Sequence, residues 1–533
     1  MTSAKHAGTK KVPAFYLDAK QLACAVLAAA LIVLAYPKAG LSGLGWLALA
    51  PLIYGLARCR SGFNASAYGW AAGFLFYCGL LYWLVPTCVA GGLNAALAVM
   101  GLAALAALLA VEWAAFAACA FYFRGAGVFL FPLAAALCWV GMEWSKQLLA
   151  QYVVWFPWFM LGYTQYKNPA VIQTASVCGV YGVSFVLAYA GFSAGSAALN
   201  FKASARFKSA FVLIPALALA FAAVGYGRVR LTLAAPLGSS AAELCSAPWC
   251  ETPHYSVAIL QPNIEQYRKW DAQFEDYICT RLKAQAELVT RSAPKNTAFA
   301  LWPESALPGY IETAKYGGLV SSAARASGLP QVLGAPSMSR EKRVSAFLFD
   351  SSGTITGVYD KRKLVPFGEY VPLRAVLGGY IGVINQLGEF DPGDKNQPLL
   401  QAGDVSIGAG ICYEAIFPYL WRERAAKGAN IFASMTNDGW YLNTAAPYQH
   451  FAANVFRAVE NGVPLVRAAN TGISGGIDRW GRITAVSKLD TDTVMFIPVL
   501  SARRTVYSKA GDWFPALCML VLGGLAVYLR RRK

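Results

Sequence analysis

The sequence predicts two structural units, a bundle of membrane-spanning helices and a single α/β domain. The chain has 533 residues, of which 57% are hydrophobic and 14% charged, whereas soluble domains carry about a quarter charged residues. Residues 21–225 hold few of the charges and residues 250–510 hold most of them. From residue 255 onward the long apolar runs are replaced by short runs rich in β-branched and aromatic residues, which are typical of strands.

Apolar segments account for the membrane unit, because a spanning helix needs about 20 mostly apolar residues. Eight such segments lie near residues 21–36, 41–57, 65–85, 92–122, 127–149, 170–199, 209–227 and 513–529. The polar N-terminal tail, and the second segment close behind the first, argue against a cleaved signal peptide. We therefore expect a bundle of seven spans over residues 1–230, a linker over 231–254, the α/β domain over 255–505, and a last span with a basic tail over 506–533.

Basic residues predict the orientation of the spans, because cytoplasmic loops carry an excess of lysine and arginine. One set of span ends carries Lys5, Lys10, Lys11, Lys20, Arg58, Arg60, Arg124, Lys202, Arg206, Lys208, Arg530, Arg531, Arg532 and Lys533. The opposite short loops carry only Lys38, Lys146 and Lys167. Both termini should therefore be cytoplasmic, and residues 228–511 should lie on the far side. The formal net charge of +18 favours an anionic membrane surface over nucleic acid as a partner, because the basic residues are scattered or flank apolar spans.

Two glutamates of the membrane unit are compatible with either a functional or a structural role. Glu112 and Glu143 lie inside apolar runs. An intramembrane carboxylate suggests a functional site, but a glutamate near the interface explains the pattern equally well. The aromatic, nearly uncharged segment 152–165 suits a position at headgroup level, facing the far-side domain. In the linker, Cys245 and Cys250 either close a small disulfide loop or remain free thiols.

Short β-rich runs and intervening helical stretches predict layered sheets and helices in the α/β domain. Strands are expected at 255–260, 297–302, 330–335, 345–350, 354–360, 405–411 and 430–436, and helices most clearly at 271–291 and 415–427. The segment 350–353, "DSSG", predicts a hairpin turn between two of the strands.

Three candidate catalytic residues each come just after an expected strand, where α/β sheets gather their sites. They are Glu304, Lys361 and Cys412. A glutamate whose pKa is raised by burial can take the thiol proton, and a lysine can stabilise an oxyanion. The cysteine can then hold an acyl group as a thioester, helped by the dipole of a helix expected to start after it.

Each of these residues also has an ordinary structural interpretation. A glutamate after a strand is usually a solvated cap, and a lone buried cysteine is usually inert. Lys361 could be a surface lysine in the basic run 361–363, interchangeable with its neighbours.

Several motifs resemble those of the nitrilase, or carbon–nitrogen hydrolase, superfamily. They are "LWPESALP" (301–308), "DKRKLVPFGEYVP" (360–372), "GICYEAIFP" (410–418) and "TNDGWY" (436–441). Together with the spans, "WFPWFMLGYTQ" (155–165) and "QPNIEQYRKW" (261–270), the chain is similar to bacterial apolipoprotein N-acyltransferases over nearly its whole length. Residues 231–254 have no counterpart in that pattern.

The resemblance implies a nitrilase-like αββα sandwich on a membrane bundle, facing the periplasm of a bacterial inner membrane. It implies a Glu–Lys–Cys triad at Glu304, Lys361 and Cys412, and a ping-pong transfer from a phospholipid to the α-amine of a diacylated apolipoprotein. Supporting residues matched by the resemblance are Glu369, Tyr413 and Glu414, and substrate-binding or lid aromatics are Trp270 and Trp440. We expect a monomer that uses no metal and no cofactor.

Other interpretations remain open at this point. A membrane-anchored amidase that hydrolyses a small substrate would fit the triad, although it needs one anchor and not eight spans. A transporter would leave the triad unexplained, and its paired broken helices are not evident. A helix cap is the alternative for Glu414, and core aromatics are the alternative for Trp270 and Trp440. Asn437 and Asp438 fit a turn, and His450 fits a structural role in a helix.

Overall fold

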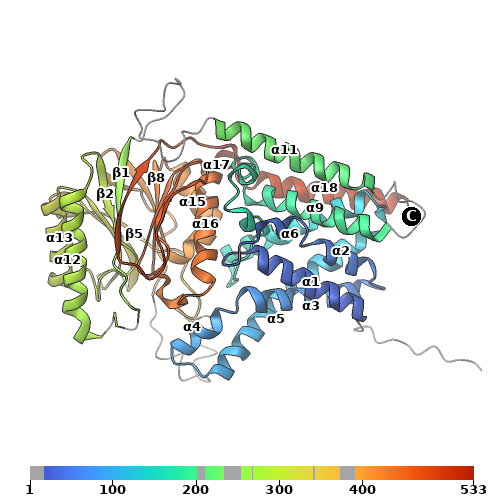
Figure 1. Cartoon of the computed structure of the whole chain (residues 1–533), viewed down its shortest axis with the longest axis horizontal. Coiled ribbons are helices and arrows are strands. Elements are labelled where there is room, and N and C mark those ends of the chain that lie inside the picture. Colours follow the sequence, from blue (N-terminus) through green and yellow to red (C-terminus); the bar gives the residue numbers. More distant parts are fainter. Residues whose placement is uncertain are drawn as a thin grey trace, which may run out of the picture.

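The computed structural model describes residues 17–200, 210–232, 254–266, 268–269, 271–339, 342–371 and 390–532. This part of the chain forms an α/β sandwich and a bundle of long helices that pack against each other (Figure 1). The last helix returns from the sandwich to lie along the bundle (Figure 1).

The sandwich contains two six-stranded sheets, one in the order β12-β1-β2-β3-β4-β5 and the other in the order β11-β10-β9-β8-β7-β6. The strands are β1 Tyr255–Gln261, β2 Thr297–Leu301, β3 Gln331–Ser337, β4 Arg343–Phe349, β5 Ile355–Asp360, β6 Leu400–Ala402, β7 Val405–Ile411, β8 Ile431–Thr436, β9 Leu465–Ala469, β10 Gly475–Ile477, β11 Ile483–Val486 and β12 Thr493–Val499. Strands β1, β2 and β3 pair in parallel, as do β7, β8 and β9. Loops after parallel strands gather at one edge of each sheet.

Apolar side chains of both sheets meet in the middle of the sandwich, in a buried cluster that includes Val257 and Ile407. The covering helices are α12 Glu275–Ser292, α13 Ala314–Ser327, α15 Pro418–Ala426 and α16 Ala446–Asn461. Helices α12 and α13 cover the first sheet, and α15 and α16 cover the second (Figure 1). Because α16 lies between the second sheet and the bundle, nearly all of its residues are buried.

The bundle is built from helices of unequal length. They are α1 Ala19–Ala35, η1 Ser42–Trp46, α2 Ala50–Ala57, α3 Gly62–Leu80, α4 Leu84–Ala90, α5 Ala95–Tyr122, η2 Phe123–Ala126, α6 Leu130–Tyr152, η3 Leu161–Gln165, α7 Pro169–Ile172, α8 Ala175–Cys178, α9 Val180–Asn200, α11 Leu213–Thr232, α17 Val506–Ala510 and α18 Trp513–Arg532. Within the described residues, four helices are long and apolar enough to cross a membrane, or five if α3 and α4, bent by 49°, form one span.

The expected count of eight spans is therefore not confirmed by length and composition. Helix α1 and the segment Ser42–Ala57 are shorter apolar helices. The expected continuous helix over 170–199 is wrong, because the structure divides it into α7, α8 and α9. The last break lies at Gly179, whose φ of +67° is a left-handed conformation that glycine adopts readily and that ends a helix.

The expected strands are present, with ends that differ by at most two residues. The expected turn is confirmed by a 2.8 Å bond from the backbone N–H of Asp350 to the carbonyl of Thr354. Strands β6, β9, β10, β11 and β12 and helix α13 were not predicted. The α-helix expected directly after Cys412 begins only at Pro418, because residues Cys412–Ile416 form the short 3₁₀ helix η6.

A continuous apolar core joins the sandwich to the bundle. One buried cluster contains residues of α3, α5, α6 and α9 together with residues of α15 and α16. Glu460 of α16 adds a polar tie, since its carboxylate accepts a 3.0 Å bond from the backbone N–H of Val180 and lies 3.0 Å from the Arg457 guanidinium. All three groups are buried.

We expect Glu460→Ala to lower the free energy of unfolding of the detergent-solubilised protein by about 3–5 kcal/mol, because it leaves the buried Arg457 without its counter-charge. Thermal unfolding of the purified variant measures this. The matched control is Glu287→Ala, which removes an exposed partner of Arg291 and should cost at most about 1 kcal/mol. Equal midpoints for the two variants would contradict the role of Glu460.

Candidate active site

Three buried side chains lie at strand ends on the same edge of the sandwich. Glu304 comes shortly after β2, Lys361 directly after β5 and Cys412 directly after β7. Their exposed fractions are 5%, 0% and 7%. The first two belong to one sheet and the third to the other, so the site lies where the two sheets meet.

The Lys361 ammonium is shared between two carboxylates. Its Nζ lies 3.0 Å from Glu304 Oε1 and 2.5 Å from Glu369 Oε1. Each carboxylate is fixed by a backbone donor through its second oxygen: Glu304 Oε2 accepts from Asn437 N at 3.0 Å, and Glu369 Oε2 accepts from Val365 N at 2.9 Å. An ammonium has three N–H donors, so one donor is left for a further acceptor.

Burial and charge act together on the ionisable groups of this cluster. Burial by itself lowers the pKa of Lys361, but the Glu304 and Glu369 carboxylates outweigh it and hold the pKa well above the usual value. Burial raises the pKa of Glu369, and the lysine opposes the shift. Burial also raises the pKa of the Cys412 thiol, Glu304 raises it further, and Lys361 lowers it. The thiol is therefore protonated at rest and needs a base.

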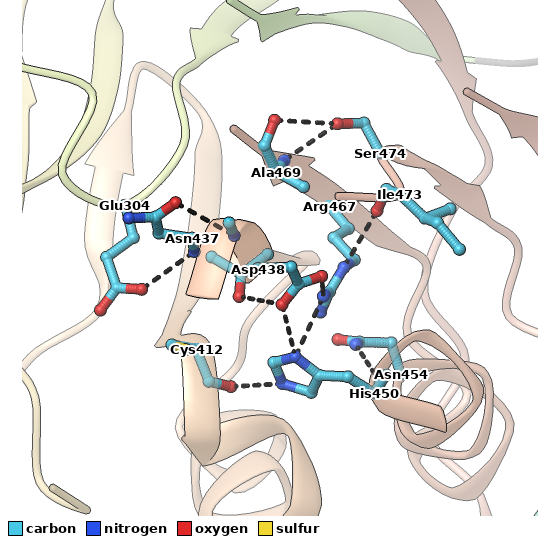
Figure 2. Close-up of polar contacts among 12 residues, drawn as sticks. Glu304, Cys412, Asn437, Asp438, His450, Asn454, Arg467, Ala469, Ile473 and Ser474 are labelled. Carbon is cyan, nitrogen blue, oxygen red and sulfur yellow. Dashed lines mark hydrogen bonds and ion pairs between the residues drawn. The ribbon is translucent and has the colours of Figure 1, made fainter. Parts of the chain in front are cut away.

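Cys412 has an unusual backbone conformation. Its φ is +49°, a left-handed region that costs a non-glycine residue about 1–3 kcal/mol. The carbonyl oxygen of Cys412 lies 2.9 Å from Nε2 of His450, which is fully buried on α16. The ring therefore holds the strained turn in place, as Figure 2 shows.

A buried ionic network fixes that histidine in turn (Figure 2). Nδ1 of His450 lies 2.9 Å from Asp438 Oδ1, and Arg467 Nη2 lies 2.7 Å from Asp438 Oδ2. Although burial raises the pKa of Asp438, Arg467 and His450 hold it at about 2. The Asp438 carboxylate thus stays ionised at neutral pH, and the buried position of His450 on α16 fits a structural role.

Glu414 connects the turn at Cys412 to the turn at Lys361. One oxygen accepts from the backbone N–H of Arg362 at 2.9 Å, and the other accepts from the backbone N–H of Ile411 at 3.0 Å and from Arg424 at 3.2 Å. These backbone groups adjoin Lys361 and Cys412. Glu414 is thus more than a helix cap, because it fixes the distance between two turns of different sheets.

Aromatic residues adjoin Cys412 on the bundle side. Tyr413 is buried and stacks on Phe156 at a centroid distance of 6.0 Å. Trp440, on the 3₁₀ helix η7 (Asp438–Tyr441), is 46% exposed, so the core interpretation is wrong for this residue. Trp270, like Cys245 and Cys250, lies outside the described residues.

The lysines of the run 361–363 have different environments. Lys361 is fully buried, whereas Lys363 donates to the carbonyl oxygens of Ala150 and Gln151 at 2.7 and 3.2 Å. Those carbonyls belong to the last turn of α6, so Lys363 connects the segment after Lys361 to the bundle. The interpretation of these lysines as interchangeable surface residues is therefore wrong.

The two glutamates of the bundle hold the aromatic segment against it. Glu112 lies 3.8 Å from Lys146 and accepts from Trp155 at 3.4 Å. Glu143 accepts from the backbone N–H of Leu161 at 2.7 Å. Both contacts position the segment that packs beside His450 and Tyr413, which gives these carboxylates a structural role.

Several residues of the site were not found from the sequence. Asn437 and Asp438 bond to Glu304 and His450 and so do more than form a turn. Arg467 is buried in the middle of β9, and a charged residue inside the apolar run "LVRAA" was the signal for it. Lys269 is fully buried beside the site, in a loop whose polar sequence gives no signal of burial.

Family models match both units of the chain. The model described as carbon-nitrogen hydrolase matches residues 256–505, and the model described as apolipoprotein N-acyltransferase N-terminal domain matches residues 28–193. Among solved structures, a carbon-nitrogen hydrolase from Helicobacter pylori G27 is 17% identical and covers 46% of this chain and 89% of its own, with a TM-score of 0.36. An amidase from Nesterenkonia is 20% identical and covers 48% of this chain and 93% of its own, also with a TM-score of 0.36.

Curated relatives match nearly the whole chain. An apolipoprotein N-acyltransferase from Geobacter metallireducens is 34% identical over 526 residues, covering 96% of this chain and 95% of the relative. One from Brucella melitensis is 32% identical and covers 88% of this chain and 87% of the relative. The sandwich is thus a nitrilase-like domain on a membrane unit, and the protein is an acyltransferase. The chain belongs to the apolipoprotein N-acyltransferase family.

We expect Glu414→Ala to lower both stability and activity, because it frees two backbone N–H groups and leaves the buried Arg424 without its carboxylate partner. The loss in stability should be about 3–5 kcal/mol, measured by thermal unfolding in detergent. The pH dependence of the remaining activity should match that of the wild type, since Glu414 positions other groups. A changed pH profile with unchanged stability would instead indicate a proton-transfer role.

Proposed function

We propose that this chain transfers an acyl chain from a phospholipid, through a thioester on Cys412, to the N-terminal α-amine of a diacylated apolipoprotein. The observation that carries the proposal is the Lys361 ammonium, buried between Glu304 and Glu369 beside the Cys412 thiol. The family supports the choice of substrates, and the contact of this site with a membrane bundle supports a lipid donor.

In the first half-reaction, Glu304 takes the thiol proton and the Cys412 thiolate attacks the ester carbonyl of the phospholipid. The free N–H donor of Lys361 stabilises the oxyanion of the tetrahedral intermediate. When the intermediate collapses, the C–O bond breaks and Glu304 gives its proton to the leaving lysophospholipid. Glu369 holds the lysine in place but exchanges no proton. In the second half-reaction, the acceptor amine attacks the thioester and releases Cys412.

A cavity of about 560 Å³ between the two units supports access from the membrane. The bundle contributes Val154 and Trp155 to its lining, and the sandwich contributes Lys363, Tyr413 and Phe417. Tyr413 directly follows Cys412 in the chain, so this cavity adjoins the turn that carries the proposed nucleophile. Aromatic side chains of the lining, such as those of Trp155 and Phe417, would limit the access of water, which would otherwise hydrolyse the thioester.

We further propose that the protein is a multi-pass monomer of a bacterial inner membrane. Residues 1–230 and 506–533 would form the membrane unit with eight spans, residues 231–254 the linker, and residues 255–505 the catalytic domain facing the periplasm. The asymmetry of lysine and arginine among the loops supports this orientation, with both termini in the cytoplasm.

The alternative of a membrane-anchored amidase is not favoured. Such an enzyme would need only an anchor, whereas the relatives named as acyltransferases match the bundle as well as the sandwich. Transporter function has no observation in its favour.

We expect Cys412→Ser to fold but to form no durable acyl-enzyme, because a hydroxyl is a far poorer nucleophile than a thiol. The measurement incubates purified protein with phospholipid labelled in its acyl chain and detects hydroxylamine-sensitive label on the protein. Wild type should carry the label. A wild-type amount of label on Cys412→Ser would refute the nucleophile.

The orientation predicts that residue 350 lies outside the cytoplasm. A reporter that is active only in the periplasm should therefore be active when fused after Asp350, which lies in an exposed turn. Fusion of the same reporter after Arg532 is the control and should be inactive. Activity of a cytoplasm-only reporter after Asp350 would overturn the orientation.

A further inference from the structure

A second buried lysine lies next to the candidate site and has no role in the mechanism above. Lys269 is 0% exposed, and its Nζ has no hydrogen-bond partner among the residues that the structure describes. An unpartnered buried ammonium is unfavourable. The charged group that acts on it is Glu304, whose carboxylate also holds Lys361.

The loop that carries Lys269 is fixed to the site by several hydrogen bonds. The backbone N–H and C=O of Ile264 bond to the side chain of Asn470 at 2.9 and 2.7 Å. Gln266 Oε1 accepts from Asn437 Nδ2 at 2.5 Å, and the backbone N–H of Asn437 bonds to Glu304. Lys269 N bonds to the carbonyl of Gln266 in the same turn. Asn437, which bonds to Glu304, thus also anchors the loop that carries Lys269.

The two half-reactions differ in their proton balance. Acylation of Cys412 by an ester releases no net proton, because the thiol proton leaves with the lysophospholipid. An α-amine has a pKa of about 8 and reaches the site mostly as an ammonium at neutral pH. Its conversion to an amide removes two protons, and only one of them returns to the Cys412 sulfur. The transfer half-reaction therefore needs a second base.

We propose that Lys269 is that second base, and that as a neutral amine it takes the first proton from the acceptor ammonium. This inference rests on the proposed acyl transfer. Lys361 cannot fill the role, because two carboxylates keep it charged, and His450 is engaged by Asp438 and the Cys412 carbonyl.

The pKa values of Lys269 and Lys361 agree with a base role for Lys269 and a charged state for Lys361. Burial lowers the pKa of Lys269 to about 7, against the opposing effect of Glu304. At neutral pH a large share of Lys269 is thus neutral and can accept a proton, whereas the pKa of Lys361 is held well above its usual value.

The steps of the transfer half-reaction balance as follows. Lys269 Nζ takes one proton from the acceptor ammonium, and the free amine attacks the thioester carbonyl, forming the C–N bond and an oxyanion. Glu304 takes the second proton from the attacking nitrogen as the C–S bond breaks. Glu304 then protonates the Cys412 thiolate, and the Lys269 ammonium loses its proton to water.

The test measures the two half-reactions separately in the full-length enzyme with Lys269→Met. Acyl-enzyme formation from labelled phospholipid should be unchanged. Transfer from the trapped acyl-enzyme to a synthetic diacylated lipopeptide with a free α-amine should fall by about 10²-fold at pH 7, since a positioned base contributes at least that much. The transfer rate of the variant should rise with the free-amine fraction of the lipopeptide up to about pH 8, whereas that of the wild type should decline only below about pH 7.

Two controls separate this role from a structural one. Hydroxylamine is already neutral at neutral pH, so it should discharge the acyl-enzyme equally fast in wild type and Lys269→Met. Lys269→Arg keeps the positive charge but cannot accept a proton, so it should not restore transfer. Restoration by arginine, equal losses in both half-reactions, or slow discharge by hydroxylamine would each overturn the proposal. Failure of wild type to form an acyl-enzyme would instead refute the proposed function.

Discussion

The site depends on one shared ion, the Lys361 ammonium that lies between Glu304 and Glu369. Removal of the lysine would leave two largely buried carboxylates without their counter-charge, which is strongly unfavourable. Glu304 is held by a backbone N–H at one oxygen and by the lysine at the other, so its carboxylate has a fixed orientation. The lysine keeps one N–H donor beyond its two carboxylate partners.

Other contacts of the site fix the position of Cys412 relative to this cluster. The cysteine comes from the second sheet and the lysine from the first, and Glu414 connects their backbones directly. His450 holds the strained turn from α16, the helix that packs between the sandwich and the bundle. Lys363 bonds the end of α6. The conformation of the turn at Cys412 is thus coupled to the membrane unit, which suits the proposed transfer from a lipid donor.

The sequence predicted the residues whose position follows from a strand end, since Glu304, Lys361 and Cys412 each come soon after a run of alternating or apolar residues. It could not predict Asp438, Arg467 or Lys269, because their burial depends on contacts between distant segments. The glycine-rich β10 gave too weak a pattern to be recognised. The break at Gly179 was missed because the flanking residues are equally apolar, and only a φ of +67° ends the helix there. The bonds from Lys363 to the end of α6 likewise depend on how the two units pack together.

The most direct test of the central claim is the single-turnover rate of Cys412 acylation in Lys361 variants. Removing one preorganised oxyanion donor lowers a rate by about 10²–10³-fold, or roughly 3–4 kcal/mol. Lys361→Ala and Lys361→Arg should both show a loss of at least this size while phospholipid still binds, because the planar guanidinium is bulkier than the ammonium. The matched control is Lys283→Ala, which removes an exposed lysine of α12 and should acylate at the wild-type rate. Equal, small losses in the three variants would contradict the role of the shared lysine.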